Sequence, residues 1–385
     1  MNVLLLTEST DSNATGSLVR AFENRKHTVA IIRPCDIYLF VSSHQSGFDR
    51  VYREEKGVIN RVIASDYDTV YPRLGDNLRY GCAILDHLHS NVGIFCPIPT
   101  SGLLTASDKF ETIQKCSQFG IRTPRTLLYS GGDSVDQLIE KIGGMPVVVK
   151  QLHGSQGKGV AYLDSMGAVR STLDSFSKAN IPVLVQEYIE ASGTDFRVFV
   201  VGGKAVASYK RVAARGDFRA NISQGGQGIK ADISKEEEYM CLMAAQAVGL
   251  PIAGVDFLRA KDGQPFLIEV NGNAGFHIEK VTGISVSKAI VAFTEQDFAQ
   301  HGNDRNKLQQ ERRDTTQLLQ SLTDEAKKTS KIIDPIVNDD YLKEILTQHK
   351  GEMLDYTDRS GQKQQRKLNS LTDLIAVMSQ TFKIQ

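Results

Sequence analysis

Apolar runs and amphipathic stretches alternate through the first hundred residues. Residues 2–7 are mostly apolar and predict a buried strand, which a polar loop over residues 8–16 joins to a helical stretch at residues 17–26. Residues 27–33 and 67–73 are typical of two more strands, the second ending in Pro72-Arg73. The order of strand, loop, helix and strand indicates an α/β domain with an open sheet over residues 1–103. Its first loop lacks the Gly-x-Gly-x-x-Gly pattern of a dinucleotide site.

The middle of the chain has a second set of strands. We expect a helix at residues 107–119, capped by Ser107 and stopped by Gly120. A continuous apolar strand at residues 145–150 ends in Lys150, and further strand patterns lie at residues 160–163, 181–189 and 196–201.

Two strand patterns separated by an Asp-Gly turn predict a hairpin near the end of this region. The first contains Gly254 and Asp256, and the second contains Glu269, Val270 and Asn271. Alternation along a strand puts Glu269 and Asn271 on one face, where Asp256 can join them, while Val270 points into the core. Two carboxylates and an amide oxygen suit Mg²⁺. The alternative is a solvated hairpin whose charges simply face water.

Lys150 is followed at once by a glycine-rich loop, Gly154-Ser155-Gln156-Gly157-Lys158-Gly159. Backbone N–H groups without side chains can surround phosphates, and Lys150 puts a charge at a sheet edge where ligands bind. A plain hairpin turn is the alternative for the loop. A second basic segment contains Lys210-Arg211 and Arg215 through Asn221, which is suited to anions if it is not a solvated loop.

The composition is that of a globular protein and argues against several classes of partner. The chain has 385 residues, 41% hydrophobic and 23% charged, as in globular proteins, and 45 basic residues balance 45 acidic ones. This balance argues against nucleic-acid and membrane partners. Five scattered cysteines without a Cys-x-x-Cys pair, and the absence of a signal-peptide pattern, indicate a cytoplasmic protein.

Residues 299–385 differ in composition and form an extension. Residues 304–331 are charged and rich in glutamine, and we expect shorter helices at residues 341–348 and 368–382, separated by a polar segment at 355–367. Amphipathic spacing favours packing on the parent domain or an oligomer interface, with acceptor recognition as the alternative. Lys363, Arg366 and Lys367 could contact RNA, but the acidic Asp355 and Asp358 favour a solvated loop.

Taken in order, these motifs resemble the ATP-grasp superfamily, and within it the RimK branch, ligases that add glutamate to the C-terminus of a ribosomal protein. The similarity covers most of residues 1–295 and includes Lys109, Gln186-Glu187-Tyr188-Ile189, Asp195-Phe196-Arg197 and Gly216 through Asn221. It implies an α/β protein, α+β at the nucleotide site, with an ATP-grasp fold. The implied divisions are an N-terminal domain at 1–103, subdomains at 104–182 and 183–298, and a helical extension at 299–385.

The resemblance also implies roles. The residues that would bind ATP are Lys109, Lys150, Gly154, Ser155, Gly157, Lys158, Gly159, Glu187, Tyr188, Ile189 and Asp195. Among them, Lys150 would also lie near the adenine, Glu187 to Ile189 would pair with the adenine edge, and Asp195 would bind the ribose. Asp256, Glu269 and Asn271 would hold one or two Mg²⁺ ions, which Mn²⁺ could replace. Arg219 and Asn221 would face the γ-phosphate and the acyl phosphate, and Arg211 the substrate.

The implied reaction is ATP-dependent ligation of an amine, favourably that of glutamate, to a carboxylate through an acyl phosphate. The acceptor would be a protein or peptide C-terminus, and the enzyme a homo-oligomer. A small-molecule or cofactor carboxylate as acceptor, a kinase acting on a hydroxyl, and a nucleotide-binding regulatory protein are the alternatives. The chain departs from the family at Gly272-Asn273-Ala274-Gly275, where Ala-Ser-Pro-Gly is common, and in its C-terminal extension.

Overall fold

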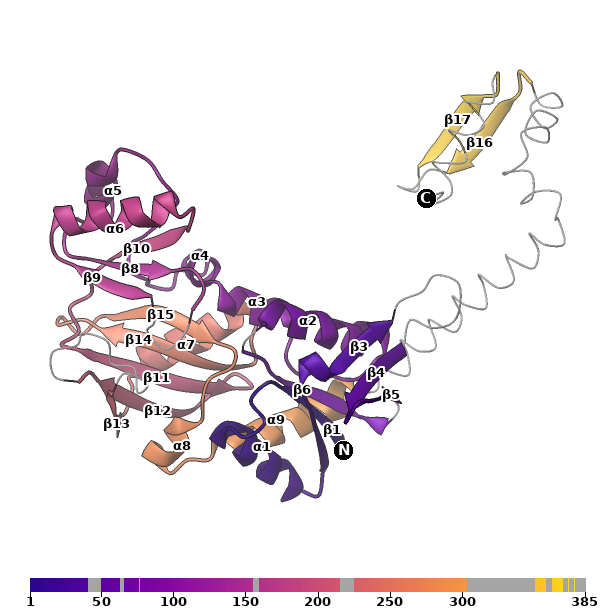
Figure 1. Ribbon diagram of the computed structural model, residues 1–385, viewed down its shortest axis with the longest axis horizontal. Helices are drawn as coiled ribbons and strands as arrows, with labels where there is room; N and C mark the ends of the chain where they lie inside the picture. The colour runs from indigo at the N-terminus through magenta and orange to yellow at the C-terminus, as the bar shows by residue number, and fades with distance from the viewer. Residues whose placement is uncertain are drawn as a thin grey trace. The chain divides into compact units, whose positions relative to one another are not determined.

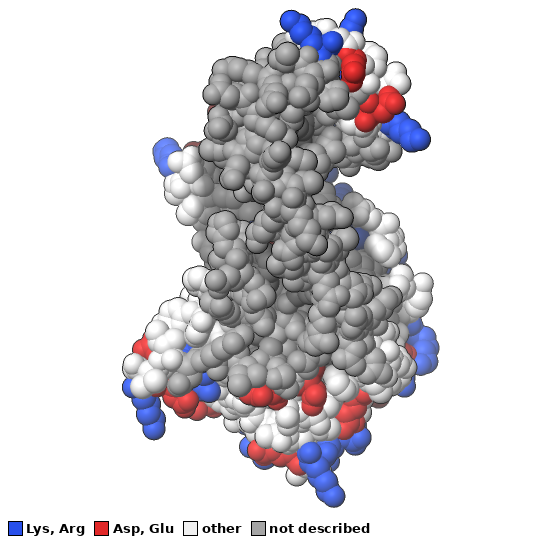
Figure 2. All heavy atoms as spheres, turned by 90° about the vertical axis from the view of Figure 1, so that its right-hand side faces the viewer, with Lys and Arg blue, Asp and Glu red and all other residues white. Residues whose placement is uncertain are grey.

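The computed structural model describes residues 1–40, 50–62, 66–75, 77–154, 159–214, 225–302, 350–357, 362–369, 373 and 377. The chain divides into two compact units, residues 1–305 and 306–385. In the described part of the chain no helix is long and apolar enough to cross a bilayer. Figure 2 shows acidic and basic side chains interspersed on the described surface in view, as expected from the balanced charge.

The first domain is built on a parallel sheet with the order β2-β1-β6, of which Figure 1 labels β1 and β6. All side chains of β1 after its first residue are buried, which explains its unbroken apolar sequence. A second, antiparallel sheet of β3, β4 and β5 is inserted between β2 and β6. The elements are β1 (Asn2–Thr7), α1 (Asn13–Glu23), β2 (Thr28–Ile32), β3 (Ile37–Phe40), β4 (Arg50–Glu55), β5 (Val58–Val62), β6 (Thr69–Arg73), α2 (Leu78–Asp86) and α3 (Thr100–Ser107), with short turns of 3₁₀ helix at Pro34–Asp36 and π helix at His87–Asn91.

A small lobe follows, with its own hydrophobic core around Val147, Val149, Val183 and Val185. Its antiparallel sheet has the order β7-β10-β8-β9. The lobe core is separate from the core that the first domain shares with the large sheet described next. The lobe elements are β7 (Thr126–Tyr129), α5 (Val135–Lys141), β8 (Val147–Gln151), β9 (Val160–Leu163), α6 (Met166–Lys178) and β10 (Val183–Glu187). Helix α4 (Lys109–Gln118), which precedes the lobe, packs with the large sheet described next.

A five-stranded antiparallel sheet, ordered β13-β12-β11-β14-β15, forms the rest of the first unit. Helix α7 packs on it, and α9 also contacts α1 of the first domain. The elements are β11 (Thr194–Val201), β12 (Lys204–Val212), β13 (Gln227–Lys230), α7 (Lys235–Val248), β14 (Ile252–Arg259), β15 (Pro265–Asn271), α8 (His277–Thr282) and α9 (Val286–His301).

The predicted cap of the helix at residues 107–119 was wrong. The helix is interrupted: Ser107 ends α3, and α4 begins at Lys109 with Asp108 as its N-cap. The Asp108 carboxylate accepts from the N–H groups of Phe110 (2.8 Å) and Glu111 (3.0 Å). A carboxylate at this position also interacts favourably with the helix dipole.

The polar segment at residues 355–367 was expected to be a loop and instead contributes to two paired strands. These are β16 (Met353–Thr357) and β17 (Lys363–Lys367), antiparallel with Met353 opposite Lys367. The predicted helices at 341–348 and over most of 368–382 lie outside the described residues.

Candidate active site

The hairpin predicted at residues 254–271 is confirmed as β14 and β15. Its register places Asp256 opposite Glu269 and Gly254 opposite Asn271. Val270 is buried, so its neighbours Glu269 and Asn271 project together from the other face of the sheet. The Asn271 Nδ2 donates to Glu269 Oε1 at 3.1 Å. The three residues therefore converge at one end of the hairpin.

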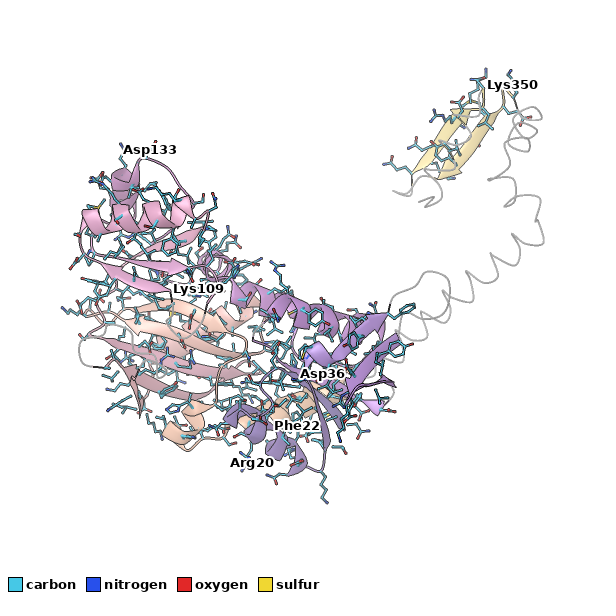
Figure 3. All side chains as sticks on the ribbon, in the orientation of Figure 1. Arg20, Phe22, Asp36, Lys109, Asp133 and Lys350 are labelled. Carbon is cyan, nitrogen blue, oxygen red and sulfur yellow. The ribbon has the colours of Figure 1, made fainter. Side chains whose placement is uncertain are left out.

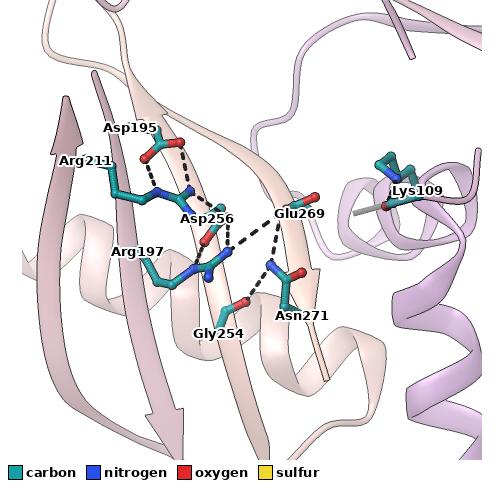
Figure 4. A network of polar contacts seen from close by, with 9 residues as sticks. Lys109, Asp195, Arg197, Arg211, Gly254, Asp256, Glu269 and Asn271 are labelled. Carbon is teal, nitrogen blue, oxygen red and sulfur yellow. Dashed lines mark hydrogen bonds and ion pairs between the residues drawn. The ribbon is translucent and has the colours of Figure 1, made fainter. Parts of the chain in front are cut away.

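The Asp256 carboxylate is bound by two arginines, one from the neighbouring strand β11 and one from β12 on the far side of β11 (Figure 4). Arg197 of β11 forms a bidentate pair with its carboxylate at 2.6 Å for both contacts. Arg211 of β12 donates to Asp256 Oδ2 at 2.7 Å and binds both oxygens of Asp195 at 2.5 and 2.8 Å. Two buried cations are thus matched by two carboxylates.

The ionisation of this network follows from burial and pairing. Burial raises the pKa of Asp256, but Arg197 and Arg211 outweigh it and hold that pKa well below its usual range. Burial raises the pKa of Asp195 against the opposing effect of Arg211, whose guanidinium contacts both of its oxygens and favours the ionised carboxylate. Burial lowers the pKa of Arg211, and the two carboxylates raise it further than burial lowers it. The pairing therefore favours the charged forms of Asp195, Asp256, Arg197 and Arg211.

Arg197 received no role from the sequence. The signal that could have found it is the i, i+2 spacing of Asp195 and Arg197, which puts both on one face of β11. The register completes the set, since Asp195 lies opposite Arg211 and Arg197 opposite Asp256. Arg211, expected at the substrate, is buried and paired with two carboxylates.

Lys109 and Lys150 differ from Arg197 and Arg211 because they do not pair with a carboxylate of the described residues. Lys109 begins α4, and its Nζ donates to the carbonyl groups of Gly154 (2.7 Å) and Leu152 (3.4 Å), which ties the helix to the start of the glycine-rich loop. Burial lowers its pKa, against a raising effect of Glu269. Figure 3 shows Lys109 where the small lobe meets the large sheet, and Figure 4 shows it across from Glu269.

Lys150 lies on β8 and is also close enough to Glu269 to feel its charge. Burial lowers the pKa of Lys150 to about 8, with Glu269 raising it and Lys109 lowering it. Neither Lys109 nor Lys150 forms an ion pair with a carboxylate of the described residues. Two cations therefore face one carboxylate, which leaves positive charge for an anionic ligand.

Comparison with known families identifies the family of the chain. A model of the RimK PreATP-grasp domain matches residues 1–102, and a model of the RimK-like ATP-grasp domain matches residues 106–294. The chain belongs to the RimK-like ATP-grasp family. The predicted resemblance and fold class are confirmed, and neither match reaches the C-terminal extension.

Curated relatives match over nearly their whole length. A probable alpha-L-glutamate ligase of Maridesulfovibrio salexigens is 34% identical over 310 residues, 80% of this chain and 99% of the relative. One of Alkalilimnicola ehrlichii is 37% identical over 304 residues, 78% of this chain and 97% of the relative.

Solved structures share the fold at lower identity. The ATP-grasp ligase PsnB complexed with a minimal precursor has a TM-score of 0.58 at 17% identity, covering 76% of this chain and 99% of its own. The macrocyclase MdnC of Microcystis aeruginosa, bound with the precursor peptide MdnA, has a TM-score of 0.57 at 18% identity, covering 77% and 100%.

The strand predicted to pair with adenine in this RimK-like protein is the end of β10. The Glu187 carboxylate accepts from the backbone N–H and Nε of Arg125 at 2.8 and 2.7 Å, and the Glu187 N–H donates to the Arg125 carbonyl. The Tyr188 N–H donates to Pro146 at 3.3 Å, whereas the Ile189 N–H has no backbone partner among the described residues. Of the three residues, Ile189 thus retains a donor for a base edge.

The remaining ATP-site predictions divide between described and undescribed residues. Gly154 and Gly159 flank the glycine-rich loop, and the Gly159 carbonyl accepts from the Gln151 N–H at 3.1 Å. Predicted residues that lie outside the described part are Ser155, Gly157, Lys158, Arg219 and Asn221.

The three predicted Mg²⁺ ligands differ in whether arginines already occupy their oxygen atoms. Glu269 and Asn271 present oxygen atoms at the open end of the hairpin, while both oxygens of Asp256 already accept from arginines. No group of three or more His, Cys, Asp or Glu within the described ranges could hold a metal ion alone. This donor set suits Mg²⁺, which takes one or two carboxylates and fills its coordination with phosphates and water.

Proposed function

We propose that this protein is an ATP-dependent ligase that joins the amine of glutamate to a carboxylate at the end of a protein or peptide chain. The observation that carries the proposal is the open set of charges formed by Lys109, Lys150 and Glu269 beside Asn271. The names of the curated relatives support glutamate as the added amino acid. The peptide complexes named for PsnB and MdnC support a polypeptide acceptor.

The reaction needs two steps because a carboxylate is a poor acylating agent. The acceptor carboxylate first attacks the γ-phosphorus of ATP, which forms an acyl phosphate and releases ADP. The glutamate amine then attacks the acyl carbon, an amide bond forms, and phosphate leaves with the electron pair of the broken C–O bond. One proton is lost from the amine.

Electrostatics is the main obstacle to the first step. Two unit negative charges about 4 Å apart repel by roughly 4 kcal/mol at an effective dielectric constant near 20. Lys109 and Lys150 are partly buried cations that can offset this repulsion, since neither pairs with a described carboxylate. We assign them to the phosphates, and we assign Arg219 and Asn221 to the same end of the site.

Glu269 and Asn271 would hold Mg²⁺, with Asp256 as a further ligand if its carboxylate is shared with Arg197. When bound, the ion supplies charge that stabilises the transferring phosphoryl group. Mn²⁺ as a substitute stays a prediction, as do homo-oligomer formation and a cytoplasmic location.

Intact-mass measurement tests the proposed function. The full-length protein is incubated with ATP, Mg²⁺ and glutamate, with and without peptides that end in a free carboxylate. Peptide masses should rise in steps of one glutamate residue, and ADP should form beyond one equivalent per enzyme only when both acceptor and glutamate are present. ADP formation with an alcohol and no amine would indicate a kinase, and addition only to small carboxylic acids would exclude the polypeptide acceptor.

A further inference from the structure

Arg73 is a cation at the junction of the first domain and the large sheet. It is the last residue of β6 and lies opposite Thr7 at the carboxyl ends of the parallel strands, the edge where open α/β sheets bind ligands. Its Nη1 donates to the carbonyl of Ala274 at 2.9 Å, and its guanidinium lies 4.9 Å from the ring centroid of Phe276. The side chain thus reaches the loop that follows β15.

The guanidinium of Arg73 is incompletely satisfied. Its Nε is buried and has no hydrogen-bond partner, and no carboxylate of the described residues pairs with it. Burial lowers the pKa of Arg73, yet an arginine stays protonated in proteins. A buried positive charge without an anion is costly, so a site that retains one is suited to an anionic ligand.

Arg33 provides a contrast within the same sheet. It follows β2 directly, at the same edge, but its guanidinium binds both oxygens of Asp36 at 2.9 and 2.7 Å. One arginine at this edge therefore has its own carboxylate, whereas Arg73 contacts a carbonyl and an aromatic ring.

Ala274, whose carbonyl accepts the hydrogen bond from Arg73, lies close to the end of the β14–β15 hairpin that carries Asn271. Ala274 comes three residues after Asn271 and packs on Gly254, where a Cβ atom would lie only 2.6 Å from that of Ala274. The Gly254 carbonyl in turn accepts from Asn271 Nδ2 at 3.4 Å. A ligand bound at Arg73 would therefore lie against the loop that directly follows Asn271.

We propose that Arg73 binds a carboxylate of the incoming amino acid, a role that rests on the proposed ligase function. The amine of that substrate reacts, while its carboxylates stay charged and enter a site that already holds phosphates and Glu269. The acceptor carboxylate is different, because it is consumed at the phosphate and meets Lys109 and Lys150 there. A fork-shaped cation away from those lysines suits the unreacted carboxylate.

The test is steady-state kinetics of Arg73→Gln, with Arg33→Gln as the matched control. Losing a hydrogen bond to a charged group should raise the KM for glutamate by about 10- to 100-fold. The KM values for ATP and acceptor should stay within about twofold, and Arg33→Gln should match wild type. Wild-type enzyme should also discriminate against glutamine or the α-amide of glutamate, and Arg73→Gln should lose that discrimination against one of them.

Arg73→Lys separates binding from folding, because lysine keeps the charge and can still donate to Ala274. We expect a smaller rise in the KM for glutamate than in Arg73→Gln, with an unchanged melting temperature. The proposal is overturned if both variants raise all three KM values together, if the rise falls on the acceptor, or if glutamate kinetics are unchanged. In the last case a wild-type enzyme that ligates would leave the proposed function intact.

Discussion

Two sets of charges lie on neighbouring parts of the same site and differ in how they are partnered. On β11, β12 and β14, Arg197 and Arg211 are matched by Asp195 and Asp256 at 2.5 to 2.8 Å. At the hairpin end, neither Lys109 nor Lys150 pairs with a carboxylate of the described residues, and Glu269 has a longer contact of 3.8 Å with Arg197. The first set is charge-matched by its own carboxylates, whereas the second has two cations that pair with no carboxylate of the described residues.

This difference in pairing predicts that one set of charges stabilises the fold and that the other binds the nucleotide. Removing one partner of a buried ion pair leaves the other charge uncompensated, so the paired set should control stability. Lysines that are partly buried and unpaired, with shifted pKa values, cluster where function requires them, so the open set should control nucleotide binding. The two sets can therefore be tested with different measurements.

The largest expected effect is on stability, in Arg211→Met. The change leaves Asp195 buried without its partner and should lower the free energy of unfolding by roughly 3–5 kcal/mol, measured by urea denaturation. Arg33→Met, which removes a surface pair, should leave the unfolding midpoint unchanged. If Arg211→Met keeps full stability and loses only turnover, Arg211 belongs to the substrate site, as the sequence first indicated.

Glu269→Gln should give the next largest effect, this time on turnover. Loss of the one carboxylate in the open set should lower kcat/KM by roughly 10²–10³-fold, the size expected for one electrostatic group in an active site. The melting temperature should not change. Glu238→Gln, on the surface of α7, is the control and should ligate normally; wild-type rates in Glu269→Gln would remove that residue from the metal site.

The pH dependence of kcat/KM for ATP should report the ionisation of Lys150. Its pKa is lowered to about 8, so its positive charge is present below that pH and is lost as the pH rises through it. We expect kcat/KM for ATP to fall about tenfold per pH unit above that value. Lys150→Arg, which keeps its charge, should remove the alkaline fall; an unchanged fall would assign it to another group.

The smallest effect concerns the helix that carries Lys109. Asp108→Ala removes the N-cap of α4 and should cost about 1 kcal/mol of unfolding free energy. Asp133→Ala, outside any helix, is the control and should leave stability unchanged. No loss in Asp108→Ala would mean that α4 is held at Lys109 by other contacts.

Local sequence pattern was enough for most elements of the first unit. The buried strands β1 and β8 show unbroken apolar runs, and the β14–β15 hairpin shows alternation around an Asp-Gly turn. The convergence of Glu269 and Asn271 follows from their spacing alone. Each of these features depends on residues close together in the chain.

Features set by distant pairing could not be predicted in the same way. The closure of Asp256 by Arg197 and Arg211 depends on the register of three strands. Strand β17, Lys363–Lys367, has no apolar residue to reveal its alternation. The unpaired Arg73 becomes visible only when the loop after β15 is brought against β6.

A crystal structure with Mg²⁺ and a non-hydrolysable ATP analogue tests the central claim most directly. We predict Lys109 and Lys150 within hydrogen-bonding distance of phosphate oxygens, Mg²⁺ on Glu269 and Asn271, and Arg211 still paired with Asp195. A nucleotide bound elsewhere, or phosphates that contact Arg197 and Arg211 in place of the two lysines, would contradict the account.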